Sequence, residues 1–328
     1  MTRIAVIDDW QGVARSSADW TALTRRADVE FFEEPFRGPD HVAATLKPFD
    51  IVVPMRERTH FPASLIEQLP NLKMIAVTGA RIWTLDIAVC TARGIVISHT
   101  AGQFSTPATA ELTLGLMLAA TRRIPQADAT IRAGGFQSGV APGMVLEGRT
   151  LGIIGLGKIG AKMARYGQAI GMKVLAWSPN LTADKAQTAG AQLVDKATLL
   201  EQSDVVTLHV VLSDRSRGLL GAQDLARMKP NAILVNSARG PLVDESALVA
   251  AVKSGRLIAA LDVYGQEPLP PDHPLRTLPN TVLTPHLGYC TTEVYGTFYG
   301  ESVENVLAFL DGKPIRLLNP EVLQRQAG

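Results

Sequence analysis

The chain has little cysteine, little excess of charge of either sign and no long apolar run. Of its 328 residues only two are cysteines, Cys90 and Cys290, too few for a disulfide framework and not at zinc-ligand spacing. We therefore expect no metal site and two reduced core thiols in a cytoplasmic protein. The formal net charge is +1 and no dense cluster of Lys and Arg occurs, which argues against nucleic acid as a partner.

The short apolar runs also argue against a membrane partner. A spanning helix needs roughly 20 consecutive apolar residues, and no stretch of this sequence approaches that length. The N-terminus fits a strand rather than a signal peptide, because Asp8 and Asp9 interrupt its apolar run. Apolar residues make up 46% and charged residues 19%, which is typical of a globular protein, and the length fits two domains.

Short apolar runs alternate with helical patterns along most of the chain. In the first part we expect strands at Ile4–Ile7, Val29–Phe32, Ile51–Pro54, Met74–Val77 and Ile95–Ile97, with helices such as Ser64–Leu69 and Leu85–Thr91. A nearly all-apolar helix at Pro107–Arg122 follows, and then an arm or loop over Ile124–Gly148. Later strands are expected at 150–155, 173–177, 205–209, 232–236, 258–262 and 281–284, with a last helix from about Glu301 to Leu310. The pattern predicts an α/β protein with doubly wound parallel sheets.

A glycine-rich turn follows the strand that begins near the middle of the chain. Gly155, Gly157 and Gly160 fit G-x-G-x-x-G between that strand and the opening of a helix. The first glycine makes the tight turn, the second lets the backbone approach a pyrophosphate, and the third lets helix and strand pack closely. The motif predicts a bound dinucleotide, held by these glycines with Lys158 and Ile159 at the start of the helix.

Ionisable side chains follow several strand ends in the second half of the sequence. They are Arg239, Asp262, Glu267 and His286. Ligands bind beyond the carboxyl ends of strands in an open parallel sheet, so these groups should face the dinucleotide. An arginine fork matches a carboxylate, and a histidine near a carboxylate can act as acid and base at neutral pH. The set suits hydride transfer to a small 2-oxo acid, with the dinucleotide supplying the hydride.

Longer motifs around these residues resemble the D-isomer-specific 2-hydroxyacid dehydrogenase family. They are the runs Ala232–Glu245, Ala260–Pro268 and Thr284–Gly288, with Thr78-Gly79 and Ala110-Glu111 earlier, so the likeness extends over nearly the whole chain. The resemblance implies a Rossmann dinucleotide-binding domain at 100–290 and a flavodoxin-like substrate-binding domain at 1–99 plus 291–328, with a cleft between them. It also implies a homodimer built through the dinucleotide-binding domain.

The resemblance also implies roles for single residues. Arg239 would bind and polarise the substrate, His286 would be the acid/base and Glu267 its partner. Cofactor contacts are expected from Gly155, Gly157, Lys158, Ile159, Gly160, Ser178, Asn180, Val211, Ala238, Asp262 and Gly288, with Asp262 near the nicotinamide. Substrate contacts are expected from Thr78, Gly79, Arg81 and Arg239. Arg81 and Trp83, like Arg56-Glu57-Arg58, follow strands of the first domain and are either solvated and packing groups or part of the substrate pocket.

The sequence departs from the family pattern at three places. NAD-selective folds place an acidic residue about 20 residues past the glycines, where it binds the ribose 2′-hydroxyl. Here Ser178-Pro179-Asn180 follows the strand, and there is no arginine at these positions to bind the 2′-phosphate of NADP. We therefore expect NAD as cofactor with NADP also accepted. The loop Ala80–Asp86 differs as well, which leaves the substrate's identity open, and Val211 stands where relatives often carry proline.

Other functions fit the same residues. One is a specialised phosphoglycerate, glyoxylate or hydroxypyruvate reductase on the same scaffold. Another is a dinucleotide-sensing binding protein like the transcriptional corepressors that share this fold, although the sequence has no long disordered tail and no basic patch. Turnover of NADH with a 2-oxo acid would separate an enzyme from a sensor.

Overall fold

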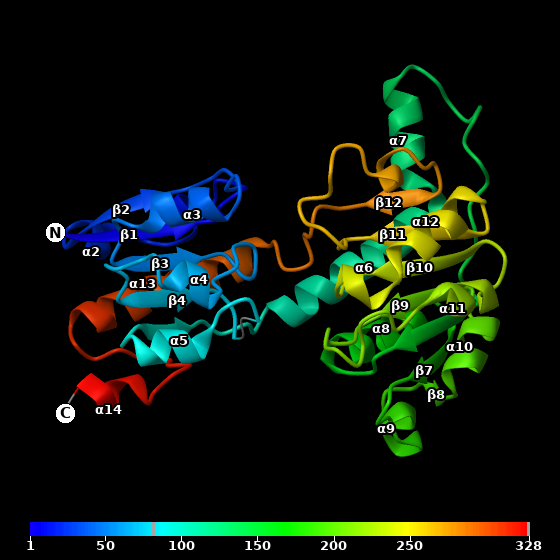
Figure 1. The fold of residues 1–328 in the computed structure, drawn as a ribbon. Helices are drawn as coiled ribbons and strands as arrows, with labels where there is room; N and C mark the ends of the chain where they lie inside the picture. Colours follow the sequence, from blue (N-terminus) through cyan, green and yellow to red (C-terminus); the bar gives the residue numbers. More distant parts are fainter. Residues whose placement is uncertain (81–82, 327–328) are drawn as a thin grey trace. The chain divides into compact units, whose positions relative to one another are not determined.

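The computed structural model describes residues 1–80 and 83–326. The chain divides into two compact units, each built on a parallel sheet flanked by helices (Figure 1). The first unit comprises Met1–Phe104 and Thr291–Gly328, and the second unit comprises Ser105–Cys290. Residues 100–104, which the sequence prediction placed in the second domain, belong to the first unit.

The first unit contains a five-stranded parallel sheet with the order β2-β1-β3-β4-β5. Its strands are β1 (Thr2–Ile7), β2 (Ala27–Phe31), β3 (Ile51–Pro54), β4 (Met74–Val77) and β5 (Val96–His99). Its helices are α1 (Ala14–Ser17), α2 (Thr21–Thr24), α3 (Pro39–Leu46), α4 (Ala63–Ile66), α5 (Ile87–Ala92), α13 (Thr292–Leu310) and α14 (Val322–Gln326). The strand order is that of flavodoxin-like sheets, so the predicted fold is confirmed.

Helices cover both faces of this sheet. Every residue of β3 and β4 is buried, as parallel strands between two helical layers require. On one face Leu46 of α3, Ile66 of α4 and Cys90 of α5 join a single apolar cluster with strand side chains. On the other face α13 packs against β4 and β5 (Figure 1). The carboxyl ends of the strands are thereby held at one edge of a rigid layer.

The second unit contains a seven-stranded parallel sheet with the order β12-β11-β10-β9-β6-β7-β8. Its strands are β6 (Thr150–Ile154), β7 (Lys173–Trp177), β8 (Gln192–Leu193), β9 (Val205–Leu208), β10 (Ala232–Asn236), β11 (Leu257–Leu261) and β12 (Thr281–Leu283). Its helices are α6 (Ser105–Arg122), α7 (Ile124–Arg132), α8 (Lys158–Ala169), α9 (Ala183–Thr188), α10 (Lys196–Gln202), α11 (Ala222–Arg227) and α12 (Glu245–Lys253), with short 3₁₀ turns η1 (Gly240–Leu242) and η2 (Pro274–Arg276). The order reverses between β6 and β9, which makes this pair the switch point where ligands bind in Rossmann folds.

The two faces of the second sheet have separate cores. Met117 of α6 and Met163 of α8 pack in the cluster on one face. Leu199 of α10, Leu225 of α11 and Leu248 of α12 pack in the cluster on the other. The strand ends that carry the ionisable residues are therefore fixed from both sides.

Two sequence-based expectations for elements need correction, and one strand was not predicted. The arm or loop predicted over residues 124–148 begins instead with helix α7. Pro125 lies in the first turn of that helix, where its missing N–H costs no hydrogen bond, so it does not prevent the helix. Helix α13 begins at Thr292 rather than near Glu301, and strand β8, with two residues, is too short for a periodicity signal.

Helices long and apolar enough to cross a bilayer do not occur among residues 1–80 and 83–326.

Candidate active site

The glycine turn after β6 has the close contacts that its motif predicts. Gly155 adopts φ +102, and a Cβ added there would lie 2.7 Å from the backbone carbonyl of His209. A Cβ on Gly160 would lie 2.2 Å from the carbonyl oxygen of Gly155. Any larger residue at either position would push the turn apart. Gly157 has nothing within 4 Å of where its Cβ would be, so the backbone there is open to a ligand.

The N-terminus of α8 fits a dinucleotide pyrophosphate. In the described part of the chain no side chain caps this helix, so the amides around Lys158 and Ile159 keep their capacity to bind an anion. Beside the turn, burial lowers the pKa of His209 to about 3, so its ring is neutral. Its Nε2 atom is buried and has no hydrogen-bond partner among the residues described. The turn and this unsatisfied polar atom are consistent with a bound ligand.

Ser178 replaces the expected acidic residue at the end of β7. Its hydroxyl oxygen accepts a hydrogen bond of 2.9 Å from the amide of Leu156, and so ties the end of β7 to the glycine turn. Asn180 is exposed, and Val211, in the loop after β9, is 63% exposed. No carboxylate at this strand end would repel a 2′-phosphate.

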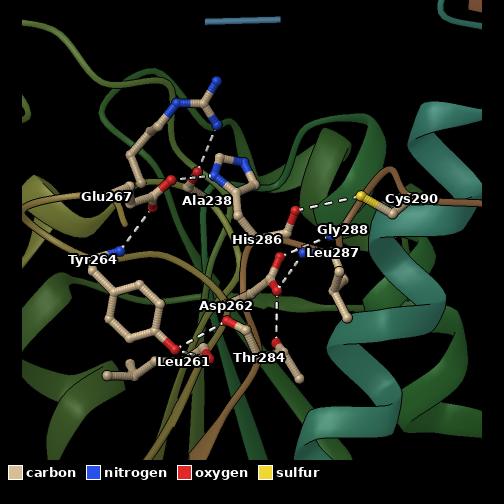
Figure 2. A network of polar contacts seen from close by, with 11 residues as sticks. Ala238, Leu261, Asp262, Tyr264, Glu267, Thr284, His286, Leu287, Gly288 and Cys290 are labelled. Atoms are coloured by element: carbon tan, nitrogen blue, oxygen red, sulfur yellow. Dashed lines mark hydrogen bonds and ion pairs between the residues drawn. The ribbon is translucent and has the colours of Figure 1, made fainter. Parts of the chain in front are cut away.

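His286 and Glu267 form a close pair in the second unit (Figure 2). His286 follows β12 with φ +56, and its Nδ1 lies 2.5 Å from Oε2 of Glu267. The other carboxylate oxygen, Oε1, accepts a 2.9 Å hydrogen bond from the amide of Tyr264. The side chains of His286 and Glu267 are 30% and 32% exposed, so the pair is shielded but reachable.

The protonation of this pair follows from its surroundings. Burial would raise the pKa of Glu267, but the hydrogen bond and charge of His286, the Tyr264 amide and the charge of Arg239 together hold it below the ordinary value. An ionised carboxylate only accepts hydrogen bonds, so Nδ1 of His286 carries a proton and donates it to Glu267. Nε2 of His286 is then the nitrogen that can exchange a proton with a substrate.

Arg239 is presented by a turn that buried polar groups hold in place. Asn236, the last residue of β10, accepts from the amide of Ala238 at 3.0 Å and donates to the carbonyl of Arg239 at 2.9 Å. Ser237 lies 2.6 Å, oxygen to oxygen, from the hydroxyl of Thr113 on α6. The guanidinium Nη1 donates to the carbonyl of Ala238 at 2.7 Å. These contacts fix the backbone from which the Arg239 side chain extends.

Gly240 joins this turn to the loop that carries Glu267. A Cβ on Gly240 would lie 2.0 Å from the carbonyl carbon and oxygen of Tyr264. The hydroxyl of Tyr264 donates to the carbonyl of Thr284 at 2.9 Å, and so connects the same loop to the strand end before His286. The Arg-Gly pair in the sequence is therefore explained by packing as well as by charge.

Asp262 holds the loop that carries His286. It is fully buried and accepts hydrogen bonds from the hydroxyl of Thr284 at 2.6 Å and the amides of Leu287 and Gly288 at 2.7 and 2.8 Å (Figure 2). Burial raises the pKa of this carboxyl, and the three donors and the charge of His286 act against that rise. The resemblance implied a position near the nicotinamide; the contacts of Asp262 within the chain support a role in positioning His286.

Asp262→Ala should destabilise the protein by about 3 kcal/mol, because three buried donors would lose their acceptor. The urea midpoint should fall while the m-value stays constant. Asp272→Ala, at an exposed aspartate of the same unit, is the control and should change stability by less than about 0.5 kcal/mol. Equal midpoints for the two variants would show that Asp262 does not hold the loop.

The residues expected to contact the substrate from the first unit have a different setting. The hydroxyl of Thr78 donates to the carbonyl of Pro54 at 3.0 Å and accepts from the amide of Arg56 at 2.7 Å. The amide of Gly79 donates to the hydroxyl of Thr100 at 2.7 Å. These contacts fix the turn after β4 and use the Thr78 hydroxyl and the Gly79 amide, which were expected to contact the substrate. Arg81 lies outside the residues described.

The sequence-based interpretation missed several residues that build the site. They are Thr113, Asn236, Ser237, Tyr264 and Thr284, all with hydrogen bonds to the loops named above. Asn236 carried a usable signal, since a polar residue at the end of an otherwise apolar strand needs internal partners when buried. Groups of three or more His, Cys, Asp or Glu that could bind a metal do not occur in the described part of the chain.

Comparison with known proteins shows the family to which the chain belongs. Residues 114–288 match the family described as D-isomer specific 2-hydroxyacid dehydrogenase, NAD binding domain. The D-3-phosphoglycerate dehydrogenase of Archaeoglobus fulgidus is 41% identical over 263 residues, 80% of this chain and 50% of that protein. The glyoxylate reductase of Thermofilum pendens is 40% identical over 269 residues, 80% of this chain and 79% of that protein.

A solved structure agrees over almost the full length. The phosphoglycerate oxidoreductase from Vibrio cholerae superposes with a TM-score of 0.90 at 38% identity, covering 95% of this chain and 100% of that one. The chain spans about half the length of the curated D-3-phosphoglycerate dehydrogenases that it matches. With the Rossmann sheet, the glycine turn and the Arg239, Glu267 and His286 positions in place, the chain belongs to the D-isomer-specific 2-hydroxyacid dehydrogenase family.

Proposed function

We propose that this chain catalyses hydride transfer between a nicotinamide dinucleotide and a small 2-oxo acid or D-2-hydroxy acid. The single observation that carries the proposal is the 2.5 Å contact between Nδ1 of His286 and Glu267. It orients the imidazole with Nε2 available for proton exchange, which is what reduction of a carbonyl requires beside a hydride donor. The charge of Arg239 acts on the same carboxylate, which supports its place in one site with the pair.

Each side chain would perform a separate part of the reaction. Arg239 would bind the substrate carboxylate and polarise the carbonyl with its planar fork of donors. His286 would give its Nε2 proton to the carbonyl oxygen during reduction and take it back during oxidation. Glu267 would stabilise the imidazolium and keep the ring in one orientation. Thr78 and Gly79 would shape the turn after β4, and Arg81 would contact the substrate.

The cofactor would lie on the glycine turn of the second unit. Gly155, Gly157 and Gly160, with Lys158 and Ile159, would bind its pyrophosphate through backbone amides. Further contacts would come from Ser178, Asn180, Val211, Ala238 and Gly288. When bound, the nicotinamide supplies or accepts the hydride. Asp262 would hold the loop that carries His286 in place.

Cofactor choice should be weakly selective. Since Ser178 neither repels nor attracts a 2′-phosphate, kcat/KM with NADH should exceed that with NADPH by less than about a hundredfold. Ser178→Asp should increase the preference for NADH by about tenfold through charge repulsion, with kcat/KM for NADH as the internal control. Initial rates with both reduced cofactors measure this. A wild-type preference of many hundredfold in either direction would contradict the expectation.

We further propose a cytoplasmic homodimer formed through the second unit. Its α7 and the segment after it expose large apolar side chains: Ile124 is 51% exposed, Ile131 55%, Phe136 74% and Val145 73%. No residue of α7 is buried, so a second copy of the chain would cover this surface. The reducing compartment is inferred from the free thiols of Cys90 and Cys290.

Replacing Ile131 and Phe136 together with glutamate should convert the dimer to a monomer at micromolar concentration, because two buried charges would oppose association. Analytical ultracentrifugation measures the mass directly. Leu323→Glu, at a 37% exposed residue of α14, is the control and should leave the mass unchanged. A dimeric double variant, or a monomeric wild type, would show that this surface does not join two copies.

The activity is tested with a panel of 2-oxo acids and both reduced cofactors. The panel contains glyoxylate, pyruvate, hydroxypyruvate and branched or aromatic 2-oxo acids. A specialised reductase would reduce only one or a few of them. At least one should be reduced with kcat/KM above about 10⁴ M⁻¹s⁻¹, as for an ordinary enzyme on its own substrate. Tight dinucleotide binding without turnover across the panel would favour the sensor function instead.

A further inference from the structure

A second histidine–carboxylate pair lies next to the loop that carries Glu267. Nε2 of His273 is 3.3 Å from Oε1 of Glu245, the first residue of α12. The other oxygen, Oε2, accepts a 2.9 Å hydrogen bond from the amide of Gly265. Neither residue was assigned a role from the sequence.

The two pairs hold successive amides of one turn. Tyr264 donates its amide to Glu267, and Gly265 donates its amide to Glu245. Each carboxylate uses its second oxygen for a histidine, so His286 and His273 are connected through two carboxylates and the backbone of Tyr264, which lies between the two amides. A shift of this turn would move the carboxylate partner of His286.

The tautomer of His273 is fixed by a third contact. The amide of Leu275 in η2 donates to Nδ1 of His273 at 3.3 Å, so Nδ1 carries the lone pair and Nε2 carries the proton. Nε2 can therefore only donate, and its partner Glu245 can only accept. The side chain of His273 is 15% exposed and that of Glu245 is 38% exposed, so the contact is partly shielded from water.

We propose that Glu245 and His273 are positioning residues for hydride transfer, acting through the turn at Tyr264–Gly265 on Glu267 and thereby on His286. The proposal rests on the proposed function, since it assigns these residues to the reaction step and not to binding. Their loss should lower kcat and leave the KM values for dinucleotide and oxo acid unchanged.

Glu245→Gln tests the proposal with little change in volume. The side-chain oxygen of a glutamine can accept a hydrogen bond from either the amide of Gly265 or Nε2 of His273, but not from both. Its amide nitrogen then faces the other donor. We expect kcat to fall about tenfold, as for a small misplacement of a reacting group. Asp244→Asn is the matched control, because Asp244 is the exposed neighbour that caps α12 and its side chain bonds only to Ser246 and Ala247 in the described interactions.

Two further variants distinguish positioning from mere folding. His273→Gln, whose amide nitrogen can replace ring Nε2 as donor to Glu245, should keep most of kcat, while His273→Leu should lose about tenfold. In a Glu267→Gln background, Glu245→Gln should have almost no additional effect, because the group through which it acts is already impaired. An equal loss of kcat in both backgrounds, or a loss confined to KM, would overturn the proposal.

A turnover-independent measurement separates failure of this proposal from failure of the proposed function. ¹⁵N NMR of the imidazole rings should show His273 as the Nε2–H tautomer, and Glu245→Gln should shift the Nδ1–H signal of His286 while Asp244→Asn does not. Inactivity of the wild type with these shifts present would refute the hydride-transfer function but not the connection. If the wild type is active but Glu245→Gln does not shift the His286 signal, the connection is refuted and the proposed function is not.

Discussion

His286→Ala should reduce kcat for oxo-acid reduction by about a thousandfold, within the range that general acid–base catalysis contributes. The ring contacts Glu267 at 2.5 Å and is held by a loop whose amides at Leu287 and Gly288 bind Asp262. In the described part of the second unit, the other histidine–carboxylate contact, between His273 and Glu245, is longer, at 3.3 Å. Removing the His286 ring takes away the proton donor and leaves the glycine turn intact.

Stopped-flow single turnover with NADH measures the loss, and fluorescence quenching measures dinucleotide affinity, which should not change. His41→Ala is the control, because His41 is exposed in the first unit and its ring nitrogen accepts only from the amide of Arg37 in the described contacts. Retention of more than about a tenth of wild-type kcat would exclude His286 as the acid/base.

Arg239→Ala should lower kcat/KM by about a thousandfold, mostly through the oxo acid and not the dinucleotide. A guanidinium that binds a carboxylate and a carbonyl stabilises the transition state by charge-assisted hydrogen bonds, and their loss leaves the substrate's charge unpaired. Arg239→Lys keeps the charge but not the fork of donors, and should still lose about a hundredfold.

Steady-state kinetics over a range of oxo-acid concentrations separates the two expectations. Arg227→Ala is the control, since Arg227 is a half-exposed cation paired with Glu201 on the surface at 2.7 Å. Full activity in Arg239→Lys would mean that only charge matters there, and unchanged kinetics in Arg239→Ala would remove Arg239 from the site.

The strand ends explain why much of the site could be predicted. Arg239, Glu267 and His286 each follow a short apolar run, and parallel strands bring their carboxyl ends to one edge of the sheet. The strands β3, β4, β7 and β10 begin and end at the predicted residues, because buried parallel strands are continuous apolar runs with clear limits.

The unpredicted parts depend on contacts between loops distant in sequence. Glu245 and His273 are 28 residues apart, and neither lies in a periodic pattern. The amide of Gly79 is used by Thr100, a hydroxyl 21 residues away, so its hydrogen bonding could not be inferred from the local sequence. Helix α7 was not predicted because the segment is short, has a proline in its first turn and is followed by several glycines.

The chirality of the product tests the proposed activity most directly. The enzyme would be incubated with NADH and the best oxo acid of the panel whose product is chiral, which excludes glyoxylate. The hydroxy acid formed would be resolved by chiral chromatography and its amount compared with the NADH consumed. Hydride transfer at this site predicts the D-2-hydroxy acid, one for each NADH oxidised, and none from His286→Ala. Formation of the L-acid, or NADH oxidation without hydroxy acid, would contradict it.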